Sequence, residues 1–218
     1  MVTPNLSTVR TVAALYVQTG GVYYNLEGVD PWDEARDARN YTGPYPVVAH
    51  PPCKRWINLT LVNYARWGGE HNRLGNDGGC FAAALDAIRR FGGVLEHPAS
   101  SHAWKRYGLL KPYGEGWCYQ PDTSFLAGRG GYHVCEVWQS AYGHRARKRT
   151  WLLYAGRVPP TDLRWERKDG VCQVAGQDWC GKSKNKPTLS SKEAASTPPE
   201  FRDALLALAR RSVTRDAK

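Results

Sequence analysis

The sequence predicts an α/β fold built on a single, doubly wound, mostly parallel sheet. Residues 11–17 (TVAALYV) form a short apolar run with β-branched residues, which is typical of a buried strand. Residues 79–91 instead have helical spacing, with Phe81, Leu85 and Ile88 on one face. Strand, helix and strand in this order favour a parallel sheet covered by helices. A chain of 218 residues is long enough for one such domain with its own core.

Further short apolar segments complete the predicted sheet. They are residues 47–49, 94–95, 133–138 and 150–155. The first of them is followed by His50-Pro51-Pro52-Cys53, and two prolines cannot continue a central strand. Cys53 is therefore expected in a loop just past the end of its strand.

The polar segment 157–195 interrupts this pattern. It is rich in Lys, Gly and Ser and has little apolar period, so we expect an irregular insertion that lies outside the sheet. Residues 1–156 and 196–218 are then expected to form the α/β domain. The last helix is indicated by Thr197-Pro198-Pro199-Glu200, a capping-box pattern with proline at the first helical position.

Composition and charge narrow the classes of partner. The net charge of +10, from 30 basic and 20 acidic residues, favours polyanionic partners, nucleic acid first, although a basic surface without a specific partner is the alternative. No apolar run is long enough to cross a membrane, and the N-terminal residues lack the apolar core of a secretion signal, so we expect a cytoplasmic protein. The six cysteines form no CxxC pair, and we predict reduced thiols and no metal site.

Two strand ends carry reactive groups. In an open parallel sheet ligands bind at the carboxyl ends of the strands, where we expect Cys53 and Glu96 to face each other. Cys53 is flanked by His50, Lys54 and Arg55, and positive neighbours lower the pKa of a thiol. The alternative for Cys53 is a small buried side chain in a rigid turn.

Glu96 and the basic run, residues 145–149 (RARKR), supply further candidate groups. A carboxyl group after a buried strand has a raised pKa if it is desolvated, and it could then protonate a ring nitrogen. A cap or an ion pair with an arginine is the alternative. In an extended segment Arg145, Arg147 and Arg149 share one side, where they would grip phosphate, unless the run is only a solvated loop.

In order along the chain, these segments resemble the motifs of the cytosine-C5 DNA methyltransferases. The matching segments are ALYVQTGGVYYNL (14–26), VVAHPPC, VLEHP, YGHRARKRTWLLYAG and ASTPPEFRDALLALA (195–209). The resemblance implies a compressed, Rossmann-like methyltransferase fold that lacks a large target-recognition domain. Similar small proteins are encoded by phages, which implies the cytoplasm of a host cell.

The resemblance also implies a mechanism. The target base is flipped out of the duplex, the Cys53 thiolate adds to C6, and Glu96 holds and protonates N3. The activated C5 then attacks the methyl group of S-adenosylmethionine, while Arg147 and Arg149 fix the base and its phosphate. The implied cofactor residues are Tyr16, Gly20, Gly21, Asp30 and Pro51. The implied base and DNA contacts are His50, His97 and Arg145.

The sequence also departs from the family pattern, and these departures keep two other functions open. Gln18 stands where the family has a glycine, and His97 stands where it has an asparagine. One alternative is an enzyme of the same fold that uses another cofactor or a free pyrimidine nucleotide. The other is a catalytically inactive, nucleic-acid-binding phage protein. A zinc deaminase does not fit, because no second cysteine follows Pro52-Cys53 at the required position.

Overall fold

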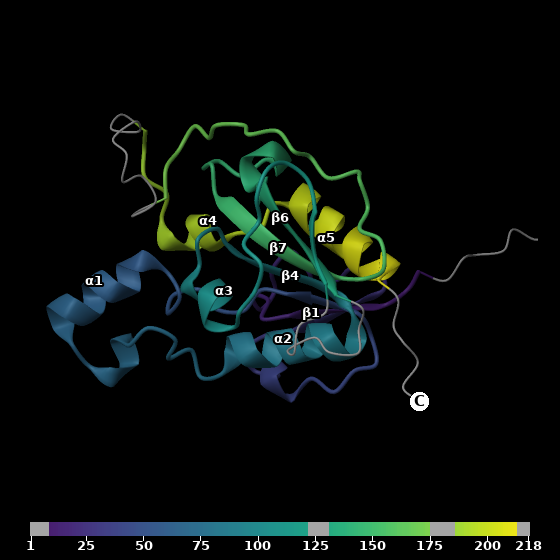
Figure 1. The fold of residues 1–218 in the computed structure, drawn as a ribbon, viewed down its shortest axis with the longest axis horizontal. Helices are drawn as coiled ribbons and strands as arrows, with labels where there is room; N and C mark the ends of the chain where they lie inside the picture. Colours follow the sequence, from purple (N-terminus) through teal and green to yellow (C-terminus); the bar gives the residue numbers. More distant parts are fainter. Residues whose placement is uncertain (1–8, 122–130, 175–185, 213–218) are drawn as a thin grey trace, which may run out of the picture.

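A computed structural model describes residues 9–121, 131–174 and 186–212, and these residues form an open sheet of seven strands in the order β2-β1-β3-β4-β7-β6-β5 (Figure 1). The strands are β1 (Val12–Leu15), β2 (Val29–Trp32), β3 (Val47–Ala49), β4 (Gly93–Pro98), β5 (Cys118–Gln120), β6 (Tyr132–Trp138) and β7 (Arg149–Ala155). The helices are α1 (Asn58–Trp67), α2 (Cys80–Phe91), α3 (His102–Arg106), α4 (Ser191–Ala195) and α5 (Pro199–Arg211). Short 3-10 turns lie at Ala38–Asn40, Glu70–Asn72 and Gln139–Tyr142.

The sheet is mixed, which corrects the expectation of a mostly parallel one. Strands β2, β1, β3 and β4 run parallel, whereas β7 pairs antiparallel with both β4 and β6, and β5 pairs antiparallel with β6. The physical reason is the connection through residues 139–148. It is too short for the crossover that a parallel pair requires, so β6 and β7 form a hairpin.

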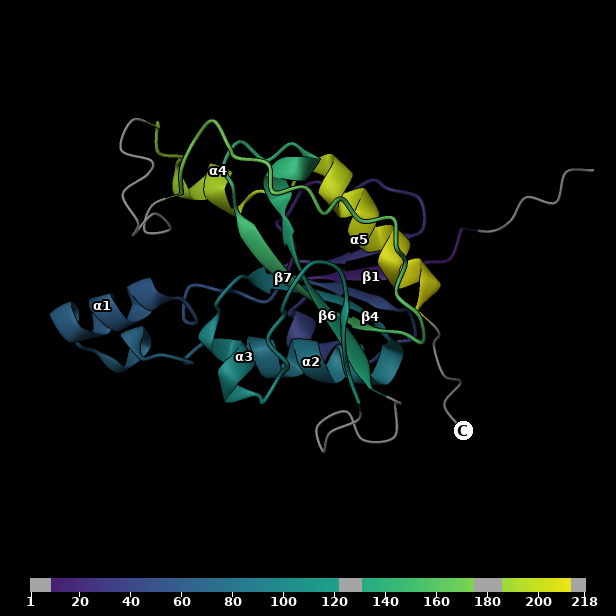
Figure 2. The same cartoon turned by 45° about the horizontal axis from the view of Figure 1, so that its top comes forward.

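Helices cover both faces of the sheet. Helices α2 and α3 lie on one face and α5 lies on the other, as two views show (Figures 1 and 2). Alternate residues along β1 divide accordingly. Ala13 and Leu15 join the core on the α2 side, and Val12 and Ala14 join the core on the α5 side.

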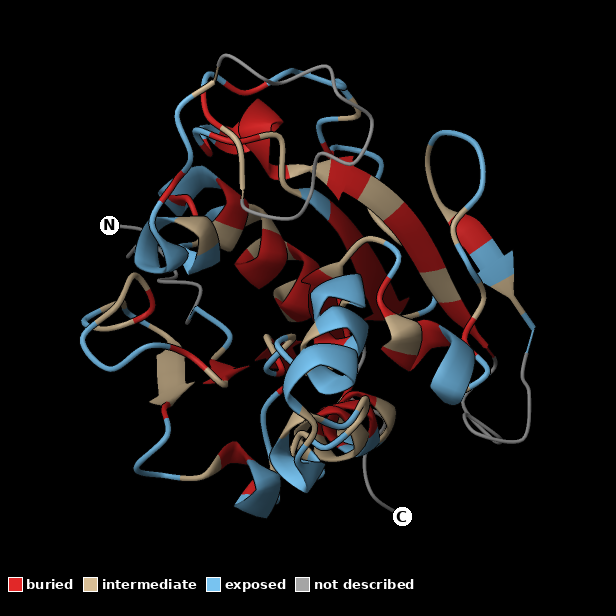
Figure 3. Cartoon of the chain, turned by 90° about the vertical axis from the view of Figure 1, so that its left-hand side faces the viewer, coloured by how far each residue is buried: buried red, intermediate tan, exposed pale blue. Residues whose placement is uncertain are grey.

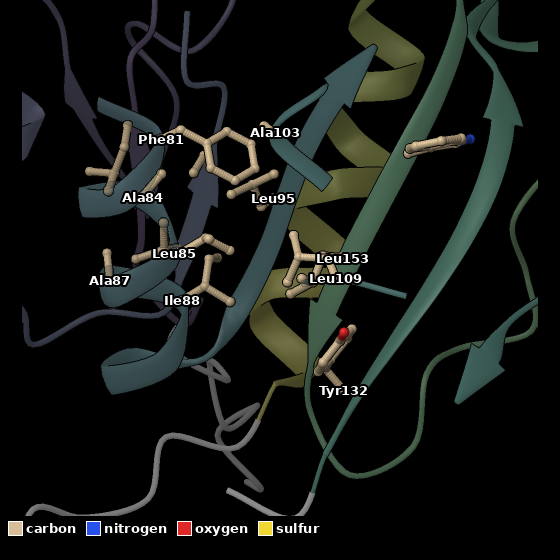
Figure 4. Close-up of a cluster of buried hydrophobic side chains, with 14 of the residues drawn as sticks. Phe81, Ala84, Leu85, Ala87, Ile88, Leu95, Ala103, Leu109, Tyr132 and Leu153 are labelled. Carbon is tan, nitrogen blue, oxygen red and sulfur yellow. The ribbon is translucent and has the colours of Figure 1, made fainter. Parts of the chain in front are cut away.

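Helix α2 has the apolar face that its spacing predicts. Phe81, Leu85 and Ile88 are fully buried and point toward Leu95 of β4 and Leu153 of β7 (Figure 4). The carboxylate of Asp77 accepts the backbone N–H groups of Gly79 and Phe81 at the start of the helix, and these are groups that the helix itself cannot satisfy.

Helix α5 has a proline at its first position, as predicted, but this proline is Pro199 and the predicted capping box is wrong. Pro198 is the N-cap residue, and no side chain caps the helix. Glu200 instead pairs with Arg164, which lies outside the helix. A capping box does form one helix earlier, where Ser190 and Glu193 cap α4.

Helix α1 stands apart from these layers. Thr60 is its one buried residue, and almost the whole helix is coloured as exposed in Figure 3. The described part of 157–195 adds no strand to the sheet and contributes α4. There, Cys172 and Leu189 pack against Ala146 in a small separate cluster. Among the described residues no helix has the length and apolar character needed to span a bilayer.

Candidate functional site

The strand order places a switch point beside β1. The chain passes from β1 to β2 on one side and then to β3 on the other, and ligands of open α/β sheets bind where the strand order reverses in this way. His50, Pro51 and Cys53 follow β3 at this edge. Because Ala49 pairs with Leu95 in parallel register, His50 comes to lie beside Glu96.

Glu96 is the centre of a chain of hydrogen bonds. One carboxylate oxygen lies 3.0 Å from Nδ1 of His50, whose Nε2 lies 2.8 Å from the Tyr23 hydroxyl. The other oxygen accepts from Nε2 of Gln139 at 3.0 Å, and the same amide donates to Oγ1 of Thr150 at 2.9 Å. Sequence reasoning missed Tyr23, Gln139 and Thr150, because their contacts join segments that are far apart in the chain.

The pKa of Glu96 is lowered, so of the two alternatives left open for this residue the desolvated carboxyl group with a raised pKa does not hold. Burial raises the pKa of this carboxyl group, but the hydrogen bond and charge of His50, and the charges of Lys148 and His97, together hold it at about 2. An ionised carboxylate can only accept, so Nδ1 of His50 carries a hydrogen and Nε2 accepts from Tyr23 when the ring is neutral. Both ring nitrogens of His50 are hydrogen-bonded, one to Glu96 and one to Tyr23, so neither is free for the predicted contact with a base.

Cys53 is half-buried, and its thiol is not activated by its neighbours in the sequence. Burial raises the pKa of the Cys53 thiol, and the negative charge of Glu96 raises it further. The cation that lowers it is Lys148, whereas Arg55 donates to Asn72 instead. The expectation of a lowered thiol pKa is therefore wrong, because desolvation outweighs the positive charge near the sulfur.

The arginines of the basic run do not form one free face. Arg145 pairs with Glu193 at 3.0 Å, and Arg149 makes a two-pronged pair with Glu136, both bonds being 2.8 Å long. The guanidinium of Arg147 lies over the ring of Trp138, 5.2 Å from its centroid. The predicted side-by-side grip by three arginines is therefore corrected.

The backbone of Lys148 is tied to residues that surround Glu96, because its carbonyl accepts the backbone N–H of Gln139 at 3.1 Å and the hydroxyl of Thr150 at 3.2 Å. Its backbone φ of +20° breaks the extended conformation that the alternation pattern requires. Its side chain is half-buried, its charge acts on both Glu96 and Cys53, and its Nζ donates to the Ser196 carbonyl at 3.1 Å. Sequence reasoning missed it, since alternation assigned it to the side opposite the arginines.

The predicted cofactor residue Asp30 is engaged in an ion pair, and the acidic residue at the strand end is Asp33. Asp30 lies inside β2 and pairs with Arg36 at 2.5 Å, whereas Asp33 directly follows the strand end. One oxygen of Asp33 accepts the hydroxyls of Thr19 at 2.7 Å and Tyr24 at 2.6 Å. The hydrogen bonds from Tyr24 and Thr19 lower the pKa of Asp33 to about 2, and the residue is only 7% exposed. Asp33 therefore holds the turn after β1.

The turn itself does not fit S-adenosylmethionine as the resemblance implies. Residues 16–28 between β1 and β2 contain no helix, so the helix N-terminus that binds anions in such folds is missing here. The backbone N–H of Gly21 donates to the Gln18 carbonyl in a tight turn, and a Cβ at Gly21 would lie 2.8 Å from that oxygen. Gly20 faces open space, while the Tyr16 hydroxyl donates to the Cys80 carbonyl at 3.0 Å.

His97 points to the opposite face of the sheet from Glu96, because neighbouring residues in a strand alternate. It is fully buried, with its ring against Phe81 at 5.0 Å and stacked on Trp104 at 6.3 Å. Burial lowers its pKa to about 4. The predicted base contact of His97 is therefore corrected to a place in the core. Cys180, one of the six cysteines predicted to be reduced thiols, lies outside the described residues.

The carboxyl edge of β3 and β4 therefore carries the Cys53 thiol and the Glu96 carboxylate, and Lys148 lies directly before β7, which pairs with β4. Such a set can add sulfur to an electron-poor carbon and stabilise charge that develops across a small polar ring. No model of a known protein family matches the chain, and no curated protein matches it either.

Proposed function

We propose that the protein is a pyrimidine-C5-modifying transferase that acts on DNA through a Cys53 nucleophile. The observation that carries the proposal is the placement of Cys53 and Glu96 at the carboxyl edge of the neighbouring parallel strands β3 and β4, where His50 of the Cys53 loop is hydrogen-bonded to Glu96. A pyrimidine ring presents C6 and N3 on opposite sides, so a thiol and a carboxylate on two neighbouring strands suit it. The net charge of +10 favours DNA as the carrier of the base.

The chemistry begins with an addition that needs no group donor. The Cys53 thiol loses its proton, and the sulfur forms a bond to C6. The electron pair of the C5–C6 double bond moves through the ring to N3, which takes up one proton, so the adduct gains and loses no charge. Glu96 accepts a hydrogen bond from the exocyclic amine of cytosine, and the His50–Tyr23 chain behind it carries the proton for N3. C5 is then electron-rich and ready to accept a group.

The addition step does not identify the donor of that group, because it proceeds without S-adenosylmethionine. The missing helix after β1 and the engaged Asp33 favour a second candidate, in which the same addition serves another donor or a free pyrimidine nucleotide. A nucleic-acid-binding protein without activity is the third candidate, and the experiment below separates all three.

The test is hydrogen exchange at C5, because the adduct takes a solvent proton at C5 before the thiol leaves. Cytosine deuterated at C5 is supplied in duplex DNA, in single-stranded DNA and as the free nucleotide, and loss of deuterium is followed by mass spectrometry. We expect exchange with the parent protein and with Cys80→Ala, and none with Cys53→Ser. Exchange only with the nucleotide supports the second candidate. DNA binding without exchange in any form of the base overturns the proposed activity.

A further inference from the structure

We propose that Gln139 is a positioning residue that orients the Glu96 carboxylate toward the base and keeps it a hydrogen-bond acceptor. The inference rests on the proposed function in taking Glu96 as the group that holds the pyrimidine. The contact that carries it is direct, because Nε2 of Gln139 donates to one carboxylate oxygen at 3.0 Å. Arg149, which the sequence resemblance places at the base, is paired with Glu136 instead.

The direction of each hydrogen bond around Gln139 follows from the groups that take part. The Thr150 hydroxyl has one hydrogen, which it donates to the Lys148 carbonyl at 3.2 Å. Its oxygen therefore accepts from Nε2 of Gln139 at 2.9 Å. The second hydrogen of the same amide nitrogen meets Glu96, and an ionised carboxylate can only accept. Both hydrogens of the amide nitrogen are thus directed at acceptors.

Gln139 is fully buried, and its backbone is held as well as its amide. Its N–H donates to the Lys148 carbonyl at 3.1 Å, and its own carbonyl accepts the N–H of His144 at 3.0 Å. Among the described residues, the side-chain oxygen Oε1 of Gln139 has no hydrogen-bond partner. Turning the amide over would direct this oxygen at the carboxylate, where two acceptors repel each other. The orientation of the amide therefore matches the needs of Glu96 rather than those of its own oxygen.

Two donors from different parts of the chain hold Glu96. His50 follows β3 and lies 3.0 Å from Oε2, and Gln139 follows β6 and lies 3.0 Å from Oε1. Because each oxygen keeps its own donor, the carboxylate cannot rotate without breaking a hydrogen bond. A carboxylate has about four acceptor sites, so sites remain for donors on the base. The ionisable groups whose charges interact with Glu96 are His50, Lys148, His97, Tyr23 and Cys53.

The first measurement follows the carboxyl carbon of Glu96 by ¹³C NMR over a pH series, in the protein without DNA, with Glu96→Gln to assign the signal. Gln139→Met keeps a long side chain but has no donor, so the pKa of Glu96 should rise by about one unit. Ser140→Ala is the matched control. It removes a buried hydroxyl from the same turn that donates to the Lys168 carbonyl, and it should leave the Glu96 midpoint unchanged.

The second measurement is the C5 exchange assay, with kcat and KM determined over the same pH series. Gln139→Met should lower kcat about tenfold and leave KM for DNA close to the parent's, because the change affects orientation rather than binding. Gln139→Glu should approach the parent at low pH, where the added carboxyl group is protonated and donates as the amide does. Its rate relative to the parent should fall as the pH rises, because two adjacent carboxylates repel each other. A purely structural role predicts no such dependence on pH.

Two results overturn the proposal: an unchanged Glu96 midpoint in Gln139→Met, or a rate of Gln139→Glu relative to the parent that does not depend on pH. Thermal denaturation shows whether Gln139→Met folds. If it does not, Gln139→Glu decides in both measurements, because its paired carboxyl groups should share a proton and raise the Glu96 midpoint. If the parent exchanges no deuterium, the proposed function fails, and the NMR midpoint, which needs no base, still decides whether Gln139 holds Glu96.

Discussion

Acidification should destabilise the protein through His97, a fully buried ring with a pKa lowered to about 4. The unfolded chain binds a proton at this histidine below about 6.5, whereas the folded chain binds it only below about 4. The unfolded state therefore gains protons first, and stability falls as the pH drops through this window. At about 1.4 kcal/mol for each pH unit, the loss amounts to about 3 kcal/mol.

The assay is urea unfolding, followed by tryptophan fluorescence, of the parent and of His97→Phe at neutral pH and near pH 4. Phenylalanine keeps a ring between Phe81 and Trp104 but cannot titrate. The parent should lose about 3 kcal/mol more than the variant on acidification. Protonation of Glu96 does not affect this comparison. Its pKa is lowered to about 2, so the stability that it contributes is lost only below about pH 4.5. Equal losses in both proteins would refute the reasoning.

Other predictions follow from the backbone and the charge. Gly93→Ala should prevent folding, because a Cβ there would lie 1.9 Å from the Val47 carbonyl oxygen, whereas Gly79→Ala meets no atom and should cost about 1 kcal/mol for its φ of +81°. Thermal denaturation checks both, and equal melting temperatures would contradict the argument. DNA affinity should fall with salt because of the net charge of +10, with a log–log slope of about −0.9 for each phosphate neutralised. Fluorescence anisotropy over a salt series checks this, and an affinity that ignores salt contradicts it.

The strands that carry the site could be predicted because they are short apolar runs bounded by glycine or proline. The predicted segment 47–49 coincides with β3, and 150–155 differs from β7 by one residue at its start. Strand β2 could not be found in this way. Its sequence, VDPW, has no apolar run, and every residue in it is only half-buried. The antiparallel hairpin of β6 and β7 was predictable in principle, because the connection at 139–148 is too short for a parallel crossover.

The chemistry of the site was harder to predict than its location. Strand ends suggest that Cys53 and Glu96 belong to one edge, and the parallel pairing of β3 with β4 places the carboxyl ends of the two strands side by side. The predicted lowering of the Cys53 pKa was wrong, and the two alternatives for Glu96 could not be separated, because both pKa shifts depend on burial and on groups distant in the sequence. Lys148 was missed because alternation assigned it to the side opposite the arginines. Its φ of +20° departs from the extended conformation on which that alternation depends.

Covalent trapping of Cys53 tests the central claim most directly. A pyrimidin-2-one base in an oligonucleotide is strongly electrophilic at C6 and lacks the exocyclic amine, so it should capture the thiol without any group donor. Intact-protein mass spectrometry should show one adduct of protein and oligonucleotide, located on Cys53 by peptide mapping, retained in Cys80→Ala and lost in Cys53→Ser. No adduct with the parent protein, or an adduct that persists in Cys53→Ser, would contradict the account.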